Sequence, residues 1–552
     1  LEAGNEDGSA GRTLDSQQDA GVTSLRAGAL REVEKVKWHP SWGAGRMANM
    51  LKGRPDWCVS RQRSWGVPIP VFYCQGCDEA IADAEIVNHV ADIFLKETAD
   101  AWYNREAKDL LPENFRCPKC SGAEFIKETD ILDVWFDSGS SCVAVLETRD
   151  NLQFPADVYF EGGDQFRGWF NSSLMCGLAA HDIAPYKQVV TYGWVVDGEG
   201  KQMHKSGGNA ISPNEVVQKS GAEIIRLWAS AMDSTQDMRC SNEILSRIVD
   251  AYRKFRNTLR YALGNLDGFN PETETVAMSE MQEIDRWALA SLDETIEKVI
   301  KSYETYNFQA VYQTLYNFVT VTLSARYFDI IKDRLYIFAP NSSERRSAQT
   351  ALYKIADNLA RLLAPILAFT ADEAWENLPH QKLASVHLAE FPKVTPSSRR
   401  LSRERPADAP SLENAKEAES AGRTLDSRRD DGVTLLADWE RIFSIRDEVL
   451  KALEEARNAK QIGSSLEAKV ILTVDKDTTY FLLSYFEDLR YIFIVSQVEV
   501  HQGDKFSVEI QKADGAKCER CWNYSVHVGA SEKYPTVCER CVAALAEIEK
   551  GL

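Results

Sequence analysis

Four pairs of cysteines, each spaced Cys-x-x-Cys, have the most readily assigned chemistry in this sequence. Two pairs, CQGC and CPKC, fall between residues 74 and 120, and two CERC pairs fall between residues 518 and 541. The eight cysteines are Cys74, Cys77, Cys117, Cys120, Cys518, Cys521, Cys538 and Cys541. One such knuckle presents two thiolates, and two knuckles complete a tetrahedral zinc site. Disulfides and unliganded core cysteines are the alternatives, but this spacing favours two structural zinc ions.

A glycine-rich loop follows the apolar segment VVTYGWVV in the stretch 189–209. Its glycines let the backbone approach a ligand closely, and Lys205 is a mobile point charge suited to polyphosphate. On its own, such a loop is more often an ordinary solvated turn. The prediction of a phosphate-binding loop therefore depends on its surroundings.

Polar side chains also follow the apolar segments of an alternating strand and helix pattern between residues 128 and 209. This pattern predicts a parallel sheet, in which ligands bind at the carboxyl ends of the strands. Glu161, Asp164, Gln165 and Lys205 fall at such ends. The alternative for Glu161 and Asp164 is capping of a helix N-terminus.

Arginines concentrate in two places. Arg61 and Arg63 lie near Trp57 and Trp65, an arrangement that frames an anionic ligand or belongs to a plain domain interface. An amphipathic helix expected over 246–266 carries basic residues that predict an RNA-facing surface, with a solvated helix face as the alternative. These residues are Arg247, Arg253, Lys254, Arg256 and Arg260.

The elements that position these residues exceed one core, because 552 residues suggest three or four domains. The sequence has no apolar run of about 18 residues and no signal peptide, so we expect a cytoplasmic protein without membrane contact. Its net charge of −19 argues against nonspecific coating of nucleic acid but leaves room for a local basic face. The segment SAGRTLDS occurs twice, at Ser9–Ser16 and Ser420–Ser427, and predicts disordered surface inserts.

Four further motifs occur in a fixed order: WCVSRQRSWGVPIP, DVWFDSGSS, YFEGGDQFRGWF and QMHKSGGN. Together they resemble the class I aminoacyl-tRNA synthetases of the isoleucine, valine and leucine group. EGGDQFRGWF and the terminal CERCW resemble the isoleucyl-tRNA synthetases in particular. The resemblance runs from about Arg26 to the end of the chain, apart from the repeated inserts.

The resemblance implies an ATP loop of Met203, His204, Lys205 and Ser206, in which Lys205 stabilises phosphate charge during adenylate formation. This loop departs from the family's KMSKS pattern at Gln202 and His204, and so loses one positive charge unless His204 is protonated. The implied aminoacyl-adenylate site comprises Glu161, Gly162, Asp164, Gln165, Trp65 and Trp169, with the two tryptophans as walls for the isoleucine side chain. The implied substrates and partners are ATP with Mg, isoleucine and isoleucine tRNA, with Arg253 and Arg256 contacting the tRNA.

The fold that follows is a multidomain chain: half of an α/β Rossmann-like catalytic domain with a zinc-ribbon insertion, an α-helical anticodon-binding bundle, a small α/β region and a terminal zinc ribbon. The expected ranges are 1–25 for the first disordered repeat insert, 26–73 with 126–235 for the half catalytic domain, 74–125 for the zinc-knuckle insertion, 236–393 for the bundle, 394–437 for the linker with the second repeat copy, 438–510 for the α/β region and 511–552 for the ribbon.

The family also needs an HIGH motif that binds ATP and an editing domain, and none of the eight histidines has HxGH spacing. We therefore expect the carboxy-terminal portion of an isoleucyl-tRNA synthetase, inactive alone and paired with a separate amino-terminal fragment. A valyl or leucyl enzyme and a noncatalytic tRNA-binding zinc protein are the alternatives.

Overall fold

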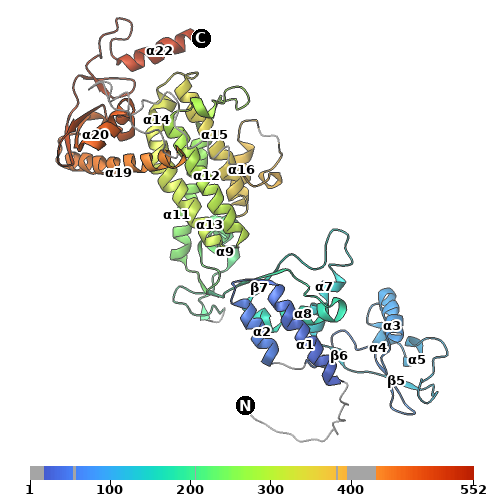
Figure 1. The fold of residues 1–552 in the computed structure, drawn as a ribbon. Coiled ribbons are helices and arrows are strands. Elements are labelled where there is room, and N and C mark those ends of the chain that lie inside the picture. The colour runs from blue at the N-terminus through green and yellow to red at the C-terminus, as the bar shows by residue number, and fades with distance from the viewer. Residues whose placement is uncertain (1–17, 54–56, 205–206, 381–382, 395–430, 552) are drawn as a thin grey trace. The chain divides into compact units, whose positions relative to one another are not determined.

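A computed structural model of the chain describes residues 18–53, 57–204, 207–380, 383–394 and 431–551 (Figure 1). Backbone contacts divide the chain into two compact units. The first comprises Leu1–Trp194 and Thr235–Asp237, and the second comprises Val195–Ser234 and Met238–Leu552. The sequence places the end of the half catalytic domain at residue 235, whereas this division places the glycine-rich loop with the helical part of the chain.

The first unit is organised around a parallel sheet of three strands in the order β1 (Lys37–His39), β8 (Gln188–Tyr192) and β7 (Tyr159–Gly162). Apolar side chains of three helices cover it and form one buried cluster with Tyr159 and Val189. The helices are α1 (Gln18–Lys35), α2 (Gly43–Gly53) and α8 (Trp169–His181). The predicted parallel sheet is therefore confirmed by these strands.

One segment expected to continue that sheet lies elsewhere in the first unit. The apolar residues before DVWFD form β6 (Ile131–Leu132), which pairs antiparallel with β2 (Ser60–Arg61). The short helices α6 (Val134–Gly139) and α7 (Ser141–Ala144) follow it. This pairing joins the SRQR segment to the residues before DVWFD across about 70 residues of sequence.

The zinc-knuckle insertion has its own small core within the first unit. Three antiparallel strands, in the order β4 (Ala80–Ile81), β3 (Phe72–Cys74) and β5 (Phe125–Lys127), support three helices. The helices are α3 (Ala84–Glu97), α4 (Ala101–Asn104) and α5 (Ala107–Leu110). Phe72 and Trp102 are buried at its centre with their rings 5.1 Å apart. The expected small helical insertion is present.

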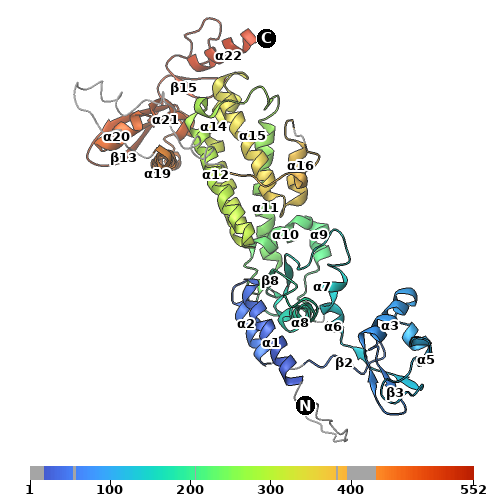
Figure 2. The same ribbon diagram turned by 45° about the vertical axis from the view of Figure 1, so that its right-hand side comes forward.

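The second unit contains a helical bundle, in which α12, α14 and α15 run side by side (Figure 2). Phe308 to Tyr336 is helical throughout, because the π-helix η4 (Phe318–Phe328) joins α13 to α14. Apolar residues at helical spacing from Leu352 to Ile366 predict one helix kinked at Pro365, but α15 ends before the proline, at Leu363. The helices of this part are α9 (Pro213–Ser220), α10 (Ala222–Ala231), α11 (Asn242–Gly264), α12 (Glu283–Glu304), α13 (Phe308–Asn317), α14 (Asp329–Tyr336), α15 (Ser343–Leu363) and α16 (Ala368–Glu376).

A small α/β region follows the bundle within the second unit. Its sheet has the order β12 (Gln497–Gln502), β11 (Ala468–Val474) and β13 (Ser507–Lys512), with β11 parallel to β12 and antiparallel to β13. Side chains of β11 alternate between buried and half-buried, as the sequence predicts for a strand with one face on a core. Three helices accompany the sheet: α19 (Asp431–Asn458), α20 (Lys476–Leu483) and α21 (Phe486–Phe493).

The helices that follow the two expected disordered segments begin earlier than the sequence predicts. Helix α1 begins at Gln18 rather than after residue 25, and α19 begins at Asp431 rather than after residue 437. Buried apolar side chains already recur at helical spacing in α19 from Leu435 through Trp439 and Ile442, so its helical face extends into the expected linker. The SAGRTLDS copies themselves lie outside the described residues.

The chain closes with β14 (Ala516–Lys517), β15 (Tyr524–Ser525) and α22 (Glu539–Gly551), which surround the last four cysteines. Among the described residues, no helix is both long and apolar enough to cross a membrane.

Candidate active site and metal centres

The carboxyl end of β7 forms a tight turn into α8 through the 3₁₀ helix η1 (Gly163–Arg167). A side chain at Gly162 has no room, because its Cβ would lie 2.7 Å from Asp164 Oδ1. The Asp164 carboxylate therefore lies directly over the strand end. This turn is the place where the predicted ligand residues Glu161, Gly162, Asp164 and Gln165 come together.

Gln165 connects this turn to the first residue of α8. The Trp169 amide donates to Gln165 Oε1 at 3.0 Å, and Gln165 Nε2 donates to Asp164 Oδ2 at 3.0 Å. Gln165 therefore satisfies one unpaired amide of the helix start while it orients the Asp164 carboxylate. The capping alternative raised by the sequence applies to Gln165 rather than to Glu161 or Asp164.

Tyr192 is a neighbour of these acids that the sequence analysis did not select. It lies opposite Gly162 in the parallel pairing of β7 and β8. Burial, together with the nearby Glu161 carboxylate, raises the pKa of the Tyr192 hydroxyl. The end of an adjacent parallel strand is a general place to look for such a residue.

Trp169 is held in a defined orientation. Its ring stacks on Tyr159 with centroids 4.0 Å apart and an interplanar angle of 10°. Its indole Nε1 donates to the Ser138 carbonyl at 3.0 Å and to Ser141 Oγ at 3.2 Å. Trp169 is thus suited to serve as one fixed wall of a binding site.

The second predicted wall, Trp65, does not lie with Trp169. Its side chain is 87% exposed, and among the described residues it makes no aromatic contact. Trp135 of DVWFD lies close instead: a Cβ at Gly168 would be 2.7 Å from Trp135 Cη2 and 2.6 Å from Gln165 Oε1. The packing against Gly168 therefore favours Trp135, which the sequence analysis missed, as the neighbour of Trp169, and the wall made by Trp65 stays a prediction.

A cavity of about 900 Å³ opens beside this turn, between α2 and η1. Arg46, Asn49, Asp164, Phe166 and Arg167 are among its lining residues. Arg46 lies over the Phe166 ring at 4.9 Å. The size of the cavity is within the range of pockets that bind small molecules, about 300 to 1,000 Å³.

The glycine-rich loop belongs to the second unit, and its base is well defined. Asn209 ties the two ends of the loop together: its Nδ2 donates to Asp197 Oδ2 at 2.8 Å and to the Gln202 carbonyl at 3.0 Å, and its Oδ1 accepts the His204 amide at 3.0 Å. The hydrogen bond from Asn209 is the main cause of a lowered Asp197 pKa. Asn209 is thus a loop-positioning residue whose role the sequence alone did not indicate.

Within this loop, the predicted ATP residues differ in environment. Met203 packs against the apolar core of the second unit, and His204 is exposed. Lys205 and Ser206 lie outside the described residues. Glu161, Asp164 and Trp169 belong to the first unit, so the two halves of the predicted site are described separately.

The cysteines of the first knuckle pair converge on one point. Cys74 Sγ lies 3.5 Å from Cys120 Sγ, and Cys77 Sγ lies 3.6 Å from Cys117 Sγ. All four sulfurs lie within 4.8 Å of one another. Zn–S bonds of about 2.3 Å in a tetrahedron separate sulfurs by about 3.8 Å, so the donor set fits zinc. A Cβ at Gly122 would press on two of these sulfurs at 3.2 and 3.3 Å.

The terminal cysteines form a second such cluster. Cys518 and Cys541 sulfurs lie 3.7 Å apart, those of Cys521 and Cys538 lie 3.6 Å apart, and all four residues are buried. Arg540, inside the second knuckle, donates to Asp333 of α14 at 2.6 Å and lies 5.3 Å from the Tyr491 ring centroid. The ribbon is therefore attached to the helical bundle by a residue that lies between two of its predicted zinc ligands in the sequence.

The predicted RNA-facing arginines lie on the exposed face of α11, but carboxylates accompany them. Arg253 donates to Asp250 at 3.0 Å, and Arg256 lies 3.7 Å from Glu373. Neighbouring acids reduce the local positive potential, so charge alone does not single out this face. Its contact with tRNA stays a prediction.

Three family models match the chain in sequence order. They are the tRNA synthetases class I (I, L, M and V) at residues 16–241, the anticodon-binding domain of tRNA ligase at 285–472 and the zinc finger found in FPG and IleRS at 515–544. With the parallel sheet, the helical domain and the cysteine clusters, these matches show that the chain belongs to the class I tRNA synthetases.

Within this class, the chain is similar to isoleucine--tRNA ligases. It is 48% identical over 537 residues to that of Syntrophotalea carbinolica, covering 95% of this chain and 54% of the relative. It is 46% identical to that of Caldicellulosiruptor saccharolyticus, covering 95% of this chain and 54% of that relative. The chain thus spans about half the length of the curated relatives it matches. Among solved structures, a ternary complex of Agrobacterium radiobacter K84 LeuRS with tRNA and LeuAMS matches 63% of this chain and 42% of that chain, at 20% identity and a TM-score of 0.46.

Proposed function

We propose that this chain contributes the adenylate-binding turn, the ATP loop, the anticodon-binding helices and a zinc ribbon to an isoleucine--tRNA ligase. The observation that carries the proposal is the β7–η1–α8 turn, which gathers Glu161, Gly162, Asp164 and Gln165 at the carboxyl end of a parallel sheet. Identity of 45–48% to isoleucine--tRNA ligases supports the choice of amino acid.

In the proposed reaction, the isoleucine carboxylate attacks the α-phosphorus of magnesium-bound ATP, and pyrophosphate leaves. Asp164 and Gln165 hold the aminoacyl adenylate at this turn, where the missing side chain of Gly162 leaves room for the Asp164 carboxylate over the strand end. Glu161 adds a second carboxylate, suited to the ammonium group or the ribose. Trp169 and Trp135 flank the amino-acid side chain. Lys205 meets the charge that develops on the pyrophosphate, because a fixed cation at that place lowers the barrier.

The two cysteine clusters hold one zinc ion each, with structural roles. Zinc supplies folding free energy to small modules that lack a sufficient core, and here each cluster organises a segment of about 30 to 50 residues. Plasma emission spectroscopy should find two zinc ions per chain purified without chelator. A content near zero, with freely titratable thiols, contradicts the assignment.

The helical bundle and the terminal ribbon bind isoleucine tRNA. Helix α11 presents Arg253, Arg256 and Arg260 on an exposed face. A valyl or leucyl enzyme predicts the same architecture with another amino acid. A noncatalytic tRNA-binding zinc protein is favoured by one observation, the replacement of the usual lysine and serine of the ATP loop by Gln202 and His204.

Charging of tRNA separates these possibilities. The chain is mixed with a complementing fragment, the portion of the Syntrophotalea carbinolica ligase that this chain does not match. Radioactive isoleucine, valine or leucine is then supplied with the cognate tRNA transcripts. The proposal expects acid-precipitable isoleucine on isoleucine tRNA only. Charging with valine or leucine supports the alternative enzymes, and tRNA binding without any charging supports the noncatalytic protein.

A further inference from the structure

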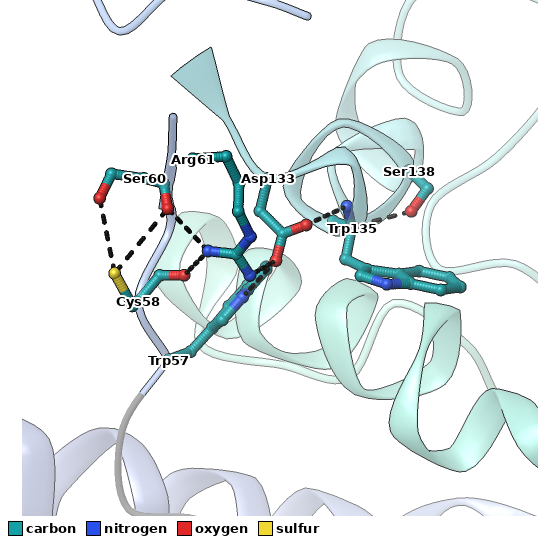
Figure 3. Close-up of polar contacts among 7 residues, drawn as sticks. All are labelled: Trp57, Cys58, Ser60, Arg61, Asp133, Trp135 and Ser138. Atoms are coloured by element: carbon teal, nitrogen blue, oxygen red, sulfur yellow. Dashed lines mark hydrogen bonds and ion pairs between the residues drawn. The ribbon is translucent and has the colours of Figure 1, made fainter. Parts of the chain in front are cut away.

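Asp133 is a buried carboxylate at the junction of two segments that are far apart in the sequence. Asp133 is only 4% exposed and lies between the end of β6 and the start of α6. Trp57 Nε1 donates to Asp133 Oδ2 at 3.0 Å, and Arg61 Nη2 donates to the same oxygen at 2.5 Å (Figure 3). The sequence predicts that Arg61 and Trp57 help to frame an anionic ligand. In the structure, the anion that these two side chains contact is the Asp133 carboxylate of the same chain.

The arginine in this cluster has little freedom. Its Nη1 donates to the Cys58 carbonyl at 2.6 Å and to the Ser60 carbonyl at 2.7 Å (Figure 3). The strand that carries it pairs with Ile131 and Leu132, and the Asp133 amide donates to the Val59 carbonyl at 2.7 Å. Arg61 therefore binds the Asp133 carboxylate from a strand whose backbone is itself hydrogen-bonded to β6.

The other oxygen of Asp133 starts helix α6. Oδ1 accepts the Trp135 amide at 3.2 Å, which is an N-cap contact. A helix of six residues is not stable alone, so its direction depends on this cap and on its neighbours. Close packing fixes its far end, because a Cβ at Gly139 would lie 2.7 Å from the Ser172 carbonyl carbon of α8.

Helix α6 in turn orients Trp169. The Ser138 carbonyl accepts the Trp169 indole N–H, and Ser138 Oγ donates to the Trp135 carbonyl at 3.3 Å. Stacking on Tyr159 sets the plane of the Trp169 ring, and the hydrogen bonds from its indole N–H to the Ser138 carbonyl and to Ser141 Oγ set its rotation within that plane. Displacement of α6 would move this acceptor and Trp135 together.

We propose that Asp133, held by Arg61 and Trp57, is a positioning residue for the amino-acid pocket: it sets α6 so that Trp135 and Trp169 are correctly placed. The inference rests on the proposed function for the identity of the pocket. It assigns to the WCVSRQR segment a role in amino-acid binding through Asp133, without contact with the substrate.

The first test measures the position of Trp169 directly and needs no catalysis. The full chain is labelled with ¹⁵N-tryptophan, and its indole N–H signals are assigned with Trp169→Phe and Trp135→Phe. Asp133→Asn keeps a capping side chain but weakens the grip of Arg61, and Arg61→Gln removes the same charge pair from the other side. Both variants should shift the Trp169 indole signal and speed its exchange with solvent.

The matched control is Asp130→Asn, which removes the charge from the nearby hydrogen bond between Gln62 Nε2 and Asp130 Oδ2, 2.6 Å long and joining the same two segments. This control should leave the Trp169 signal in place. Trp57→Phe is a milder variant, since it removes one hydrogen bond and keeps the charge pair. A Trp169 signal that is unchanged in folded Asp133→Asn or Trp57→Phe protein, or that moves equally in Asp130→Asn, overturns the inference.

The second test uses isoleucine-dependent exchange of pyrophosphate into ATP by the chain with its complementing fragment. Misplacement of a binding wall should raise KM for isoleucine about tenfold in Asp133→Asn and leave KM for ATP unchanged. Equal changes in both KM values, or loss of stability alone, contradict a positioning role. Absence of exchange by the wild-type mixture with every amino acid counts against the proposed function instead, and the indole signals then decide the positioning role.

Discussion

Removal of Arg540 should loosen the terminal zinc ribbon from the helical bundle without removing any zinc ligand. In Arg540→Gln, the ion pair to Asp333 at 2.6 Å and the contact with Tyr491 are lost together. The arginine side chain is 12% exposed and the aspartate 32%, so the pair is intermediate between a surface pair and a buried one. A surface pair contributes less than about 1 kcal/mol, and breaking a buried pair costs about 3 to 5 kcal/mol. We therefore expect about 2 kcal/mol, or about a 30-fold shift toward the undocked ribbon.

Hydrogen exchange followed by mass spectrometry measures this shift. Amides of α14 and of the ribbon residues 515–551 should exchange faster in Arg540→Gln, while those of the zinc-knuckle insertion keep their wild-type rates. Arg457→Gln is the matched control, because its pair with Glu454 at 2.6 Å lies on an exposed face of α19. A double-mutant cycle with Asp333→Asn should be non-additive. Exchange equal to that of the control, or strictly additive effects, would refute a docking role for Arg540.

Three other outcomes follow from contacts in the structure. Asp285 is fully buried and accepts hydrogen bonds from Tyr327 and Arg334. In urea titrations, Asp285→Asn should therefore lower the free energy of unfolding by about 3 kcal/mol. The control Glu390→Gln, at an exposed ion pair, should change it little. Burial and the charge of Asp133 raise the pKa of Asp137 in the folded protein. The protonated Asp137 side chain therefore stabilises the fold below the unfolded pKa of about 3.9, and this stabilisation is lost as pH rises through the folded pKa. Asp137→Asn should accordingly be more stable than wild type at pH 7, and thermal melts at falling pH should show that the difference disappears near pH 4; an equal difference at both pH values contradicts this origin. Replacement of Arg253 and Arg256 by Ala should lower both the affinity for isoleucine tRNA and its salt dependence in anisotropy titrations, and no change in either would place the RNA surface elsewhere.

Features written in local spacing could be predicted from the sequence. The four Cys-x-x-Cys knuckles predict two four-thiolate clusters, and both clusters are present. The alternation of Ala468, Val470, Leu472 and Val474 predicts strand β11 in the same way. The GGDQ turn followed β7 as expected, because a strand end and a helix start a few residues apart leave little choice of geometry.

Features that depend on distant pairing could not be predicted. Arg61 and Asp133 are 72 residues apart, and nothing in either motif shows that one neutralises the other. Trp65 and Trp135 lie in equally aromatic segments, so only the structure shows that Trp135 packs against Gly168 whereas Trp65 is exposed. The start of α19 was misplaced because polar repeat residues conceal a helical face that becomes visible at Leu435 and Trp439.

Isoleucine-dependent exchange of pyrophosphate into ATP tests the central proposal most directly. The 552-residue chain alone should exchange negligibly, because it spans only about half the length of the isoleucine--tRNA ligases it matches. Addition of the complementing fragment should restore exchange with isoleucine in preference to leucine and methionine. Lys205→Ala should abolish that exchange, whereas Lys201→Ala, at an exposed lysine paired with Glu199 in the same loop, should retain it. Exchange that survives Lys205→Ala, or that prefers another amino acid, would contradict the assignment of this chain to isoleucine activation.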